Sequence, residues 1–138
     1  MISSTSDYAL RAVILLATEY NREPVRANAI AEVTGAPRNY MGKTLNALVK
    51  AGVLRSARGP QGGFSLALPP EDITIARVID CFVEPRPHSR CLIGNKPCDP
   101  ANPCAAHNLW ADISKTRREP FARTTIADIV GTSNQPAL

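Results

Sequence analysis

With 138 residues and a formal net charge of +4, the chain has the size of one ordinary domain and can bury a core without a disulfide framework. Its start, Met1-Ile2-Ser3-Ser4, lacks the basic segment and long apolar run of a signal peptide, and the apolar run 12–17 is too short to span a bilayer. These features predict a cytoplasmic protein without a membrane span, in which cysteines more often bind metals or react than form disulfides.

The positive charge is concentrated in the first half of the chain. Residues 1–58 hold eight Lys or Arg and four Asp or Glu, whereas residues 59–138 hold eight of each kind. Between Pro24 and Arg58 there are six basic residues and one acidic residue, Glu32. This distribution is expected of a nucleic-acid-binding face, although a solvated helix surface would carry similar charge.

The first predicted helix follows hydroxyl side chains at 3–6 that suit an N-cap, with Asp7 in its first turn, and it ends near Asn21. Residues 27–34 predict a short second helix that Gly35 ends.

Pro37 suits the first turn of a third helix, which closes at Gly52 and turns its larger apolar side chains inward: Tyr40, Met41, Leu45, Leu48 and Val49. A short helix, a tight glycine turn and a second helix predict a helix-turn-helix.

Two short strands are predicted after the third helix, at 53–56 and 64–66. The turn between them, RGPQGG at 58–63, is rich in glycine and carries an arginine at its base. A hairpin with such a loop behind a helix-turn-helix predicts a wing whose backbone approaches DNA, although the same loop alone would suit an ordinary hairpin.

The C-terminal half predicts three more helices. The first spans 73–83 with Ile75, Val78, Ile79 and Phe82 on one side. A longer helix begins at Cys104 or Ala105, presents Leu109, Trp110 and Ile113, and should kink or break at Pro120. Thr124 or Thr125 caps a last helix at 126–130, which Gly131 ends.

The run from Cys81 to His107 contains all four cysteines and both histidines. Six residues separate Cys91 from Cys98, five separate Cys98 from Cys104, and His107 follows three residues later. A long structureless run inside a domain is usually functional, and a shared metal centre explains this concentration of ligands. A structural zinc site would usually show a two-residue thiolate spacing, which this run lacks, whereas a redox disulfide stays open.

Several runs together resemble a known family. They are SDYALRA at 6–12, AGVL at 51–54, RGPQGGF at 58–64, LPPEDIT at 68–74, and the three spaced cysteines that close with CAAH at 104–107. Over nearly its whole length the chain resembles the IscR/NsrR-type (Rrf-two) family of dimeric bacterial winged-helix repressors and activators, many of which carry an iron–sulfur cluster. The resemblance implies homodimerisation through the long helix and cluster-gated binding to a palindromic double-stranded DNA operator.

The resemblance also suggests how a cluster is held. Cys91, Cys98 and Cys104 are the expected thiolate ligands, and a 2Fe-2S cluster is favoured, with 4Fe-4S open because the cysteine spacing varies among subgroups. His107 is the expected fourth ligand, since the IscR branch uses histidine at this spacing; the alternative, as in the NsrR branch, is Asp7 of the partner subunit. His88 is expected to be solvated, and Cys81 to fill space at the dimer contact rather than bind metal.

The expected DNA contacts lie on the third helix and the wing. The start of the third helix supplies Arg38, Asn39, Tyr40 and Lys43, and Arg and Asn have bidentate geometry for guanine and adenine. Tyr40 has an equally good explanation as a core aromatic. The hairpin supplies Arg55, Arg58, Gly59, Pro60, Gly62 and Gly63. Gly42 stands where several family members carry a base-reading glutamate, so operator preference does not transfer.

The sequence therefore predicts a mainly α protein with a small β-wing, formed by a winged helix-turn-helix and a long dimerisation helix. Its parts are a DNA-binding domain at 1–80, a cluster-binding loop at 81–107, the dimerisation helix with a short terminal helix at 104–131, and a tail at 132–138. The predicted function is a DNA-binding transcription regulator gated by an iron–sulfur cluster that senses iron, redox or nitric oxide status. The alternatives are a cluster-free regulator switched by thiol oxidation or a small molecule, and a redox enzyme or electron carrier, against which no catalytic motif is visible.

Overall fold

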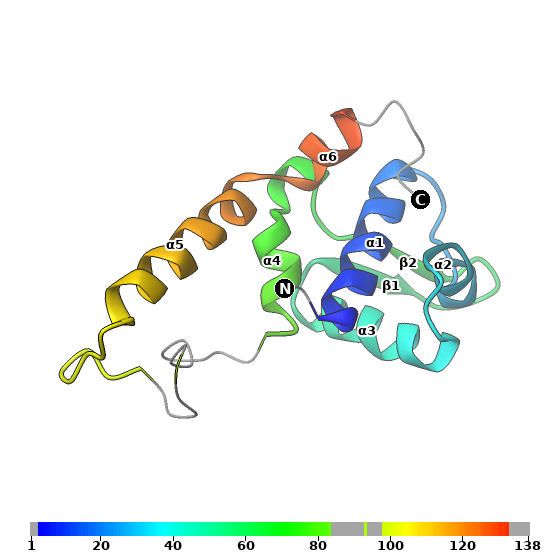
Figure 1. The fold of residues 1–138 in the computed structure, drawn as a ribbon. Coiled ribbons are helices and arrows are strands. Elements are labelled where there is room, and N and C mark those ends of the chain that lie inside the picture. Colours follow the sequence, from blue (N-terminus) through cyan, green and yellow to red (C-terminus); the bar gives the residue numbers. More distant parts are fainter. Residues whose placement is uncertain (1–2, 84–92, 94–97, 133–138) are drawn as a thin grey trace.

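The computed structural model describes residues 3–83, 93 and 98–132. This part of the chain is mainly helical, with one two-stranded antiparallel sheet beside α1, α2 and α3 (Figure 1). The elements in order are α1 (Ser4–Thr18), α2 (Ala27–Thr34), α3 (Arg38–Lys50), β1 (Leu54–Ala57), β2 (Gly63–Leu66), the 3-10 turn η1 (Pro70–Asp72), α4 (Ile75–Asp80), α5 (His107–Arg123) and α6 (Ile126–Thr132). The predicted fold class, mainly α with a small β-wing, is confirmed. None of the described helices is long and apolar enough to cross a membrane.

Helix α1 forms the centre of the core. Its N-cap is Ser3, whose hydroxyl accepts a hydrogen bond from the backbone of Ser6 at 3.2 Å. The buried stripe on α1 packs against α2, α3, α4 and α6, and it consists of Ala9, Ala12, Val13, Leu16 and Ala17. The helix ends at Thr18 rather than near Asn21, because the chain turns there and Asn21 takes a left-handed conformation (φ 68°).

The helix-turn-helix forms as predicted. Helix α2 spans Ala27–Thr34, and Gly35 ends it in the left-handed conformation (φ 73°), which glycine adopts at little cost. Pro37 takes the N-cap position of α3, one residue before the expected first turn. Helix α3 buries Met41, Leu45 and Leu48 in the core.

The wing is a short hairpin with a defined register. Leu54 pairs with Leu66 and Ala57 pairs with Gly63, so the loop 58–62 forms the tip. Leu54 and Leu66 are buried at the base of the hairpin, which fixes the hairpin to the helical core. Val25 is a second partner of β2, through an isolated antiparallel bridge to Phe64.

The C-terminal segments return to the N-terminal core. Helix α4 begins at Ile75 rather than 73, because Thr74 forms a bridge to Thr125 and its side chain caps α4 by accepting from the backbone of Arg77 at 3.1 Å. Thr125 in turn caps α6, since its hydroxyl accepts from the backbone of Asp128 and its own N–H donates to the Asp128 carboxylate. Ile126 of α6 is fully buried in the core, and α6 packs on α1.

Helix α5 lies beside α4 and extends away from the winged helix (Figure 1). It begins at His107, later than predicted, because a turn in which His107 N–H donates to the Cys104 carbonyl precedes it. The predicted break at Pro120 does not occur, since the helix continues to Arg123. Pro120 lies in the last turn, where its missing N–H removes one hydrogen bond and its carbonyl accepts from Thr124.

The predicted stop of the last helix is also wrong, since α6 runs through Gly131 to Thr132. The hydroxyl of Thr132 donates to the carbonyls of Asp128 and Ile129 and satisfies acceptors that the helix end would leave open.

Candidate nucleic-acid interface and metal-binding loop

The start of α3 presents polar side chains to solvent. Arg38, Asn39 and Lys43 are exposed, and none of the three has a side-chain hydrogen bond or ion pair with another described residue. A guanidinium, an amide and an ammonium without partners at the start of the second helix of a helix-turn-helix have the chemistry to bind a base edge or a phosphate. The helix positions them because Met41, Leu45 and Leu48 on its opposite face are buried.

Tyr40 lies beside these residues, and its side chain does not take the inward position that we expected. Its side chain is 39% exposed, and its hydroxyl makes a short hydrogen bond with the hydroxyl of Thr5. Its ring meets Tyr8 edge-on, with centroids 6.2 Å apart and planes at 75°. Tyr40 therefore covers the start of α1 instead of entering the core, because Met41 takes the inward position.

The wing tip exposes Arg58, which likewise has no partner among the described residues. Gly59 beside it has a positive φ of 101°. Two other glycines of the hairpin face protein backbone: a Cβ on Gly62 would lie 2.4 Å from the Ala57 carbonyl oxygen, and one on Gly63 would lie 2.5 Å from that of Val25. These close contacts give Gly62 and Gly63 a structural requirement of their own.

The basic charge of the first half is not neutralised internally. The ion pairs in the described part of the chain are Asp7–Arg11 at 3.2 Å, Glu19–Arg22 at 2.9 Å and Asp80–Arg118 at 3.2 Å. None of them involves the six basic residues between Pro24 and Arg58: Arg26, Arg38, Lys43, Lys50, Arg55 and Arg58. The field of this segment is therefore available to an anionic partner.

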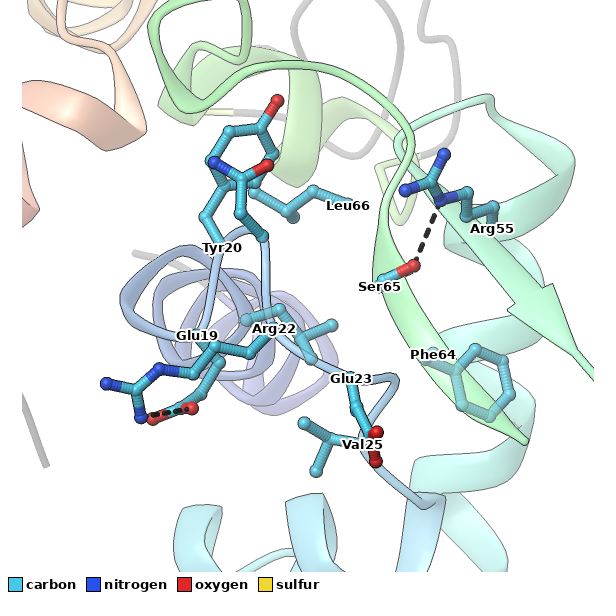
Figure 2. Close-up of a pocket in the computed structure, with 11 residues that line it drawn as sticks. Glu19, Tyr20, Arg22, Glu23, Val25, Arg55, Phe64, Ser65 and Leu66 are labelled. Atoms are coloured by element: carbon cyan, nitrogen blue, oxygen red, sulfur yellow. Dashed lines mark hydrogen bonds and ion pairs between the residues drawn. The ribbon is translucent and has the colours of Figure 1, made fainter. Parts of the chain in front are cut away.

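A small cavity lies behind the wing, between the turn after α1 and strand β2 (Figure 2). In Figure 2, Arg55 donates to the Ser65 hydroxyl at 3.1 Å, and Arg22 is turned onto Glu19. The cavity measures about 60 Å³, whereas small-molecule pockets usually measure about 300–1,000 Å³. It offers no room for an effector of ordinary size.

The proposed metal ligands are only partly described. Cys91 and His88 lie outside the described residues, while Cys98 is half-buried, Cys104 is exposed and His107 is the first residue of α5. Among the residues that the structure describes, no three His, Cys, Asp or Glu side chains are grouped closely enough to hold a metal ion. Because Cys91 is outside this set, the predicted ligand group is not tested.

Two buried nitrogen atoms at the start of α5 have no hydrogen-bond partner in the described structure. They are Nδ1 of His107 and Nε1 of Trp110. The two side chains lie three residues apart and therefore on one face of the helix, one turn from Cys104. Leaving a buried polar atom unpaired costs about 1–3 kcal/mol, so native structures usually supply a partner.

The other cysteine and the rival ligand lie elsewhere. The Cys81 thiol follows α4, is half-buried and donates to the Arg77 carbonyl at 3.1 Å. Burial raises the pKa of the Cys81 thiol above its ordinary value. Asp7 is half-exposed in the first turn of α1 and is paired with Arg11.

Three features of this surface were not predicted from the sequence. Thr5 and Tyr8 contact the hydroxyl and the ring of Tyr40, and Arg26 contacts the wing tip through the Pro60 carbonyl. Trp110 was predicted as an apolar helix residue and not as a buried donor. No local pattern could have identified these contacts, because the partners of Tyr40 and Arg26 are more than thirty positions away in sequence.

Comparisons with known proteins agree with this geometry. The family model Rrf2, described as an iron-dependent transcriptional regulator, matches residues 2–132. A candidate HTH-type transcriptional regulator from Aquifex aeolicus is 36% identical over 94% of this chain and 91% of its own length. The HTH-type transcriptional regulator IscR of Aliivibrio salmonicida is 33% identical over 82% of this chain and 67% of its own.

Two solved structures are similar throughout. CymR, the global cysteine regulator of B. subtilis, superposes with a TM-score of 0.80 at 25% identity over 97% of this chain and 98% of its own. IscR of T. potens superposes with a TM-score of 0.76 at 27% identity over 99% of this chain and 93% of its own. The chain belongs to the Rrf2 family of transcriptional regulators.

Proposed function

We propose that this transcriptional regulator binds a palindromic DNA operator as a homodimer, and that an iron–sulfur cluster in the loop 81–107 sets its affinity. The observation that carries the cluster proposal is the buried and unpartnered Nδ1 of His107. The proposal treats residues 1–80 as the DNA-binding domain and residues 104–131 as the dimerisation segment.

The proposed DNA surface joins the start of α3 to the wing. Arg38 and Asn39 would read base edges, with Tyr40 beside them, and Lys43 would contact phosphate. In the hairpin, Arg55 and Arg58 would contact the DNA backbone. The glycine-rich turn would contact it through Gly59, Pro60, Gly62 and Gly63. The exposure of these charged side chains and their lack of acidic partners in the described chain support this assignment.

The residues at the start of α5 fit an iron–sulfur centre. Cys98 and Cys104 lead into the helix, and His107 offers an imidazole nitrogen that has no hydrogen bond to lose. Cys91, Cys98, Cys104 and His107 would hold the cluster, which would supply a redox-active and chemically labile centre. The nearby indole N–H of Trp110 could donate a hydrogen bond to it. A 2Fe-2S cluster is favoured because imidazole replaces one thiolate, and 4Fe-4S is the alternative.

Asp7 of the partner subunit is the second candidate for the fourth ligand. Its carboxylate is about half exposed and already pairs with Arg11 at 3.2 Å, so ligation would require it to leave that ion pair. The unpaired nitrogen of His107 needs no such exchange, which favours the histidine.

Dimerisation is supported by apolar side chains on α5 that the monomer leaves in solvent. Leu109 is 59% exposed and Ile113 is 45% exposed, and both lie on the same helix as the half-buried Trp110. Apolar residues at positions i and i+4 on an exposed helix form a natural seam for a second copy. A two-fold dimer through α5 would present two copies of α3 to the two halves of an operator.

A cluster-free regulator switched by thiol oxidation is the competing function. The structural similarity to CymR, a cysteine regulator, supports this alternative. The cavity behind the wing measures only about 60 Å³, so it does not support a small-molecule switch at that place. Anaerobic purification separates these functions, because the cluster proposal requires a coloured protein with stoichiometric iron and sulfide.

The fourth ligand has its own test. His107→Ala should leave a coloured protein that loses its cluster faster, whereas Asp7→Ala should leave cluster lifetime unchanged. Visible absorbance followed over time in air gives both rates. If Asp7→Ala instead bleaches quickly while His107→Ala keeps the cluster lifetime of the unsubstituted protein, the fourth ligand is the carboxylate of Asp7.

A further inference from the structure

The wing is joined to the helix-turn-helix by the two residues that precede α2. Val25 and Phe64 exchange two backbone hydrogen bonds, of 2.9 Å from Val25 N–H and 2.8 Å from Phe64 N–H. Gly63 allows this approach, because a Cβ at that position would lie 2.5 Å from the Val25 carbonyl oxygen. The bridge to Val25 therefore holds the end of the hairpin next to the tip, where Phe64 follows Gly63.

Arg26 extends this connection to the tip of the wing. Its guanidinium donates a short hydrogen bond to the carbonyl of Pro60, thirty-four positions away in sequence. Its backbone carbonyl accepts from Ile30 and thereby closes the first turn of α2, of which Arg26 is the N-cap. One residue thus belongs to the helix-turn-helix and also holds the loop that Arg58 flanks.

The Arg26–Pro60 contact is a long-range side-chain restraint on a loop that otherwise has few. Within the described structure, the tip 58–62 has one internal backbone hydrogen bond, from Gly62 N–H to the Gly59 carbonyl at 3.0 Å. Gly59 adopts a positive φ, and glycine-rich loops lose much conformational freedom when they are ordered. Without Arg26, that ordering would have to occur when DNA binds.

We propose that Arg26 is a positioning residue for DNA binding, which holds the wing tip in its binding conformation before DNA arrives. This inference rests on the proposed DNA interface. Arg26 acts through Arg58 and the loop, not by touching DNA itself. The reason is pre-organisation: ordering a flexible interface segment during binding lowers affinity even when every contact is finally made.

The first test uses the protein without DNA. Arg26→Ala should speed hydrogen exchange of the loop amides, Gly62 in particular, by roughly tenfold, since one charge-assisted hydrogen bond is lost. Exchange in α3 should stay unchanged and show that the fold is intact. Arg22→Ala is the matched control, because Arg22 is an exposed arginine nearby that pairs with Glu19 and not with the wing.

The second test is a double-mutant cycle on a duplex enriched from a random-sequence pool by the unsubstituted protein. Failure to enrich any duplex would reject the proposed function itself, separately from this inference. On the enriched duplex, Arg26→Ala should weaken binding roughly three- to tenfold, as expected for ordering a loop on binding, while Arg22→Ala changes it little.

The cycle then decides between positioning and direct contact. In an Arg58→Ala background, the Arg26→Ala effect should shrink toward zero, because both substitutions act through the same loop. If Arg26→Ala weakens DNA binding by the same factor with and without Arg58→Ala, Arg26 makes a separate phosphate contact and the inference is overturned. Unchanged exchange of the loop amides in the DNA-free Arg26→Ala protein would overturn it as well.

Discussion

The hydroxyl of Tyr40 in the first turn of α3 hydrogen-bonds the hydroxyl of Thr5 in the first turn of α1. The Tyr40 ring also packs edge-on against Tyr8, one turn further along α1. The start of the recognition helix is thus attached to the start of the central core helix. Asp7, which we propose as the alternative cluster ligand, belongs to the same turn of α1, so a change at this end of α1 would act directly on α3.

Tyr40→Phe measures how much the hydrogen bond between Tyr40 and Thr5 contributes to the free energy of unfolding. The substitution keeps the ring against Tyr8 and removes only the hydroxyl, so the free energy of unfolding should fall by about 0.5–1.5 kcal/mol. Thr5→Val should cost a similar amount, and the double variant should cost less than the sum, since the two share one bond. Urea unfolding gives all three values. Strict additivity would show that the hydroxyl contact contributes nothing in solution.

Specificity should separate the residues at the start of α3. Arg38→Ala and Asn39→Ala should each lose about 1–3 kcal/mol at one base position and flatten discrimination there. Lys43→Ala should weaken binding to all sequences equally and lower the salt slope by about one. Affinities on a set of single-base duplex variants at several salt concentrations test this division. A base-specific effect at Lys43, with uniform effects at Arg38 and Asn39, would reverse the assignment.

Two glycines should respond oppositely to the same substitution. Gly42 lies within α3 with open space around its Cβ position, so Gly42→Ala should raise the free energy of unfolding by about 0.5–1 kcal/mol. Gly63 combines a φ of 154° with the close approach of Val25, so Gly63→Ala should lower it by at least about 1–3 kcal/mol. Thermal or urea unfolding compares them directly. Equal effects of the two substitutions would contradict the close approach of Val25 to Gly63.

The cap of α6 should be visible in the pH dependence of stability. The backbone N–H of Thr125 holds the pKa of the Asp128 carboxyl below its ordinary value. The folded pKa is the lower one, so this contribution is present above about pH 4, the usual Asp pKa, and is lost as pH falls through the folded value. Asp128→Asn should therefore be less stable than the unsubstituted chain near neutral pH and approach it in acid. A stability difference that does not change with pH would exclude an electrostatic role.

Much of the winged helix could be predicted from sequence because its signals are local. The bounds of α2, its glycine stop and the hairpin with its tip follow from apolar periodicity and turn residues within a few positions of each other. The errors have a common cause, which is tertiary context. Helices α5 and α6 pack against α4 and α1, so α5 tolerates the one backbone hydrogen bond that Pro120 removes, and Gly131, which keeps its N–H, stays within α6.

The candidate site was less predictable for the same reason. The contacts of Arg26 with Pro60 and of Tyr40 with Thr5 join segments that only the folded chain brings together. The spacing of Cys98, Cys104 and His107 predicts a ligand set, but spacing alone carries no information on the unpaired nitrogens of His107 and Trp110. Burial of a polar atom is a property of the fold, and sequence patterns do not report it.

The central claim, that cluster state sets operator affinity, is tested most directly by quantitative gel shifts of cluster-loaded and cluster-free protein on the enriched duplex. The two forms should differ by about 1–3 kcal/mol, or roughly 5- to 150-fold in affinity. A variant with Cys91, Cys98 and Cys104 all replaced by alanine should be colourless and should bind as the cluster-free protein does under every condition. If that variant instead binds as the cluster-loaded protein does, over the same range of duplexes, the loop does not control DNA binding.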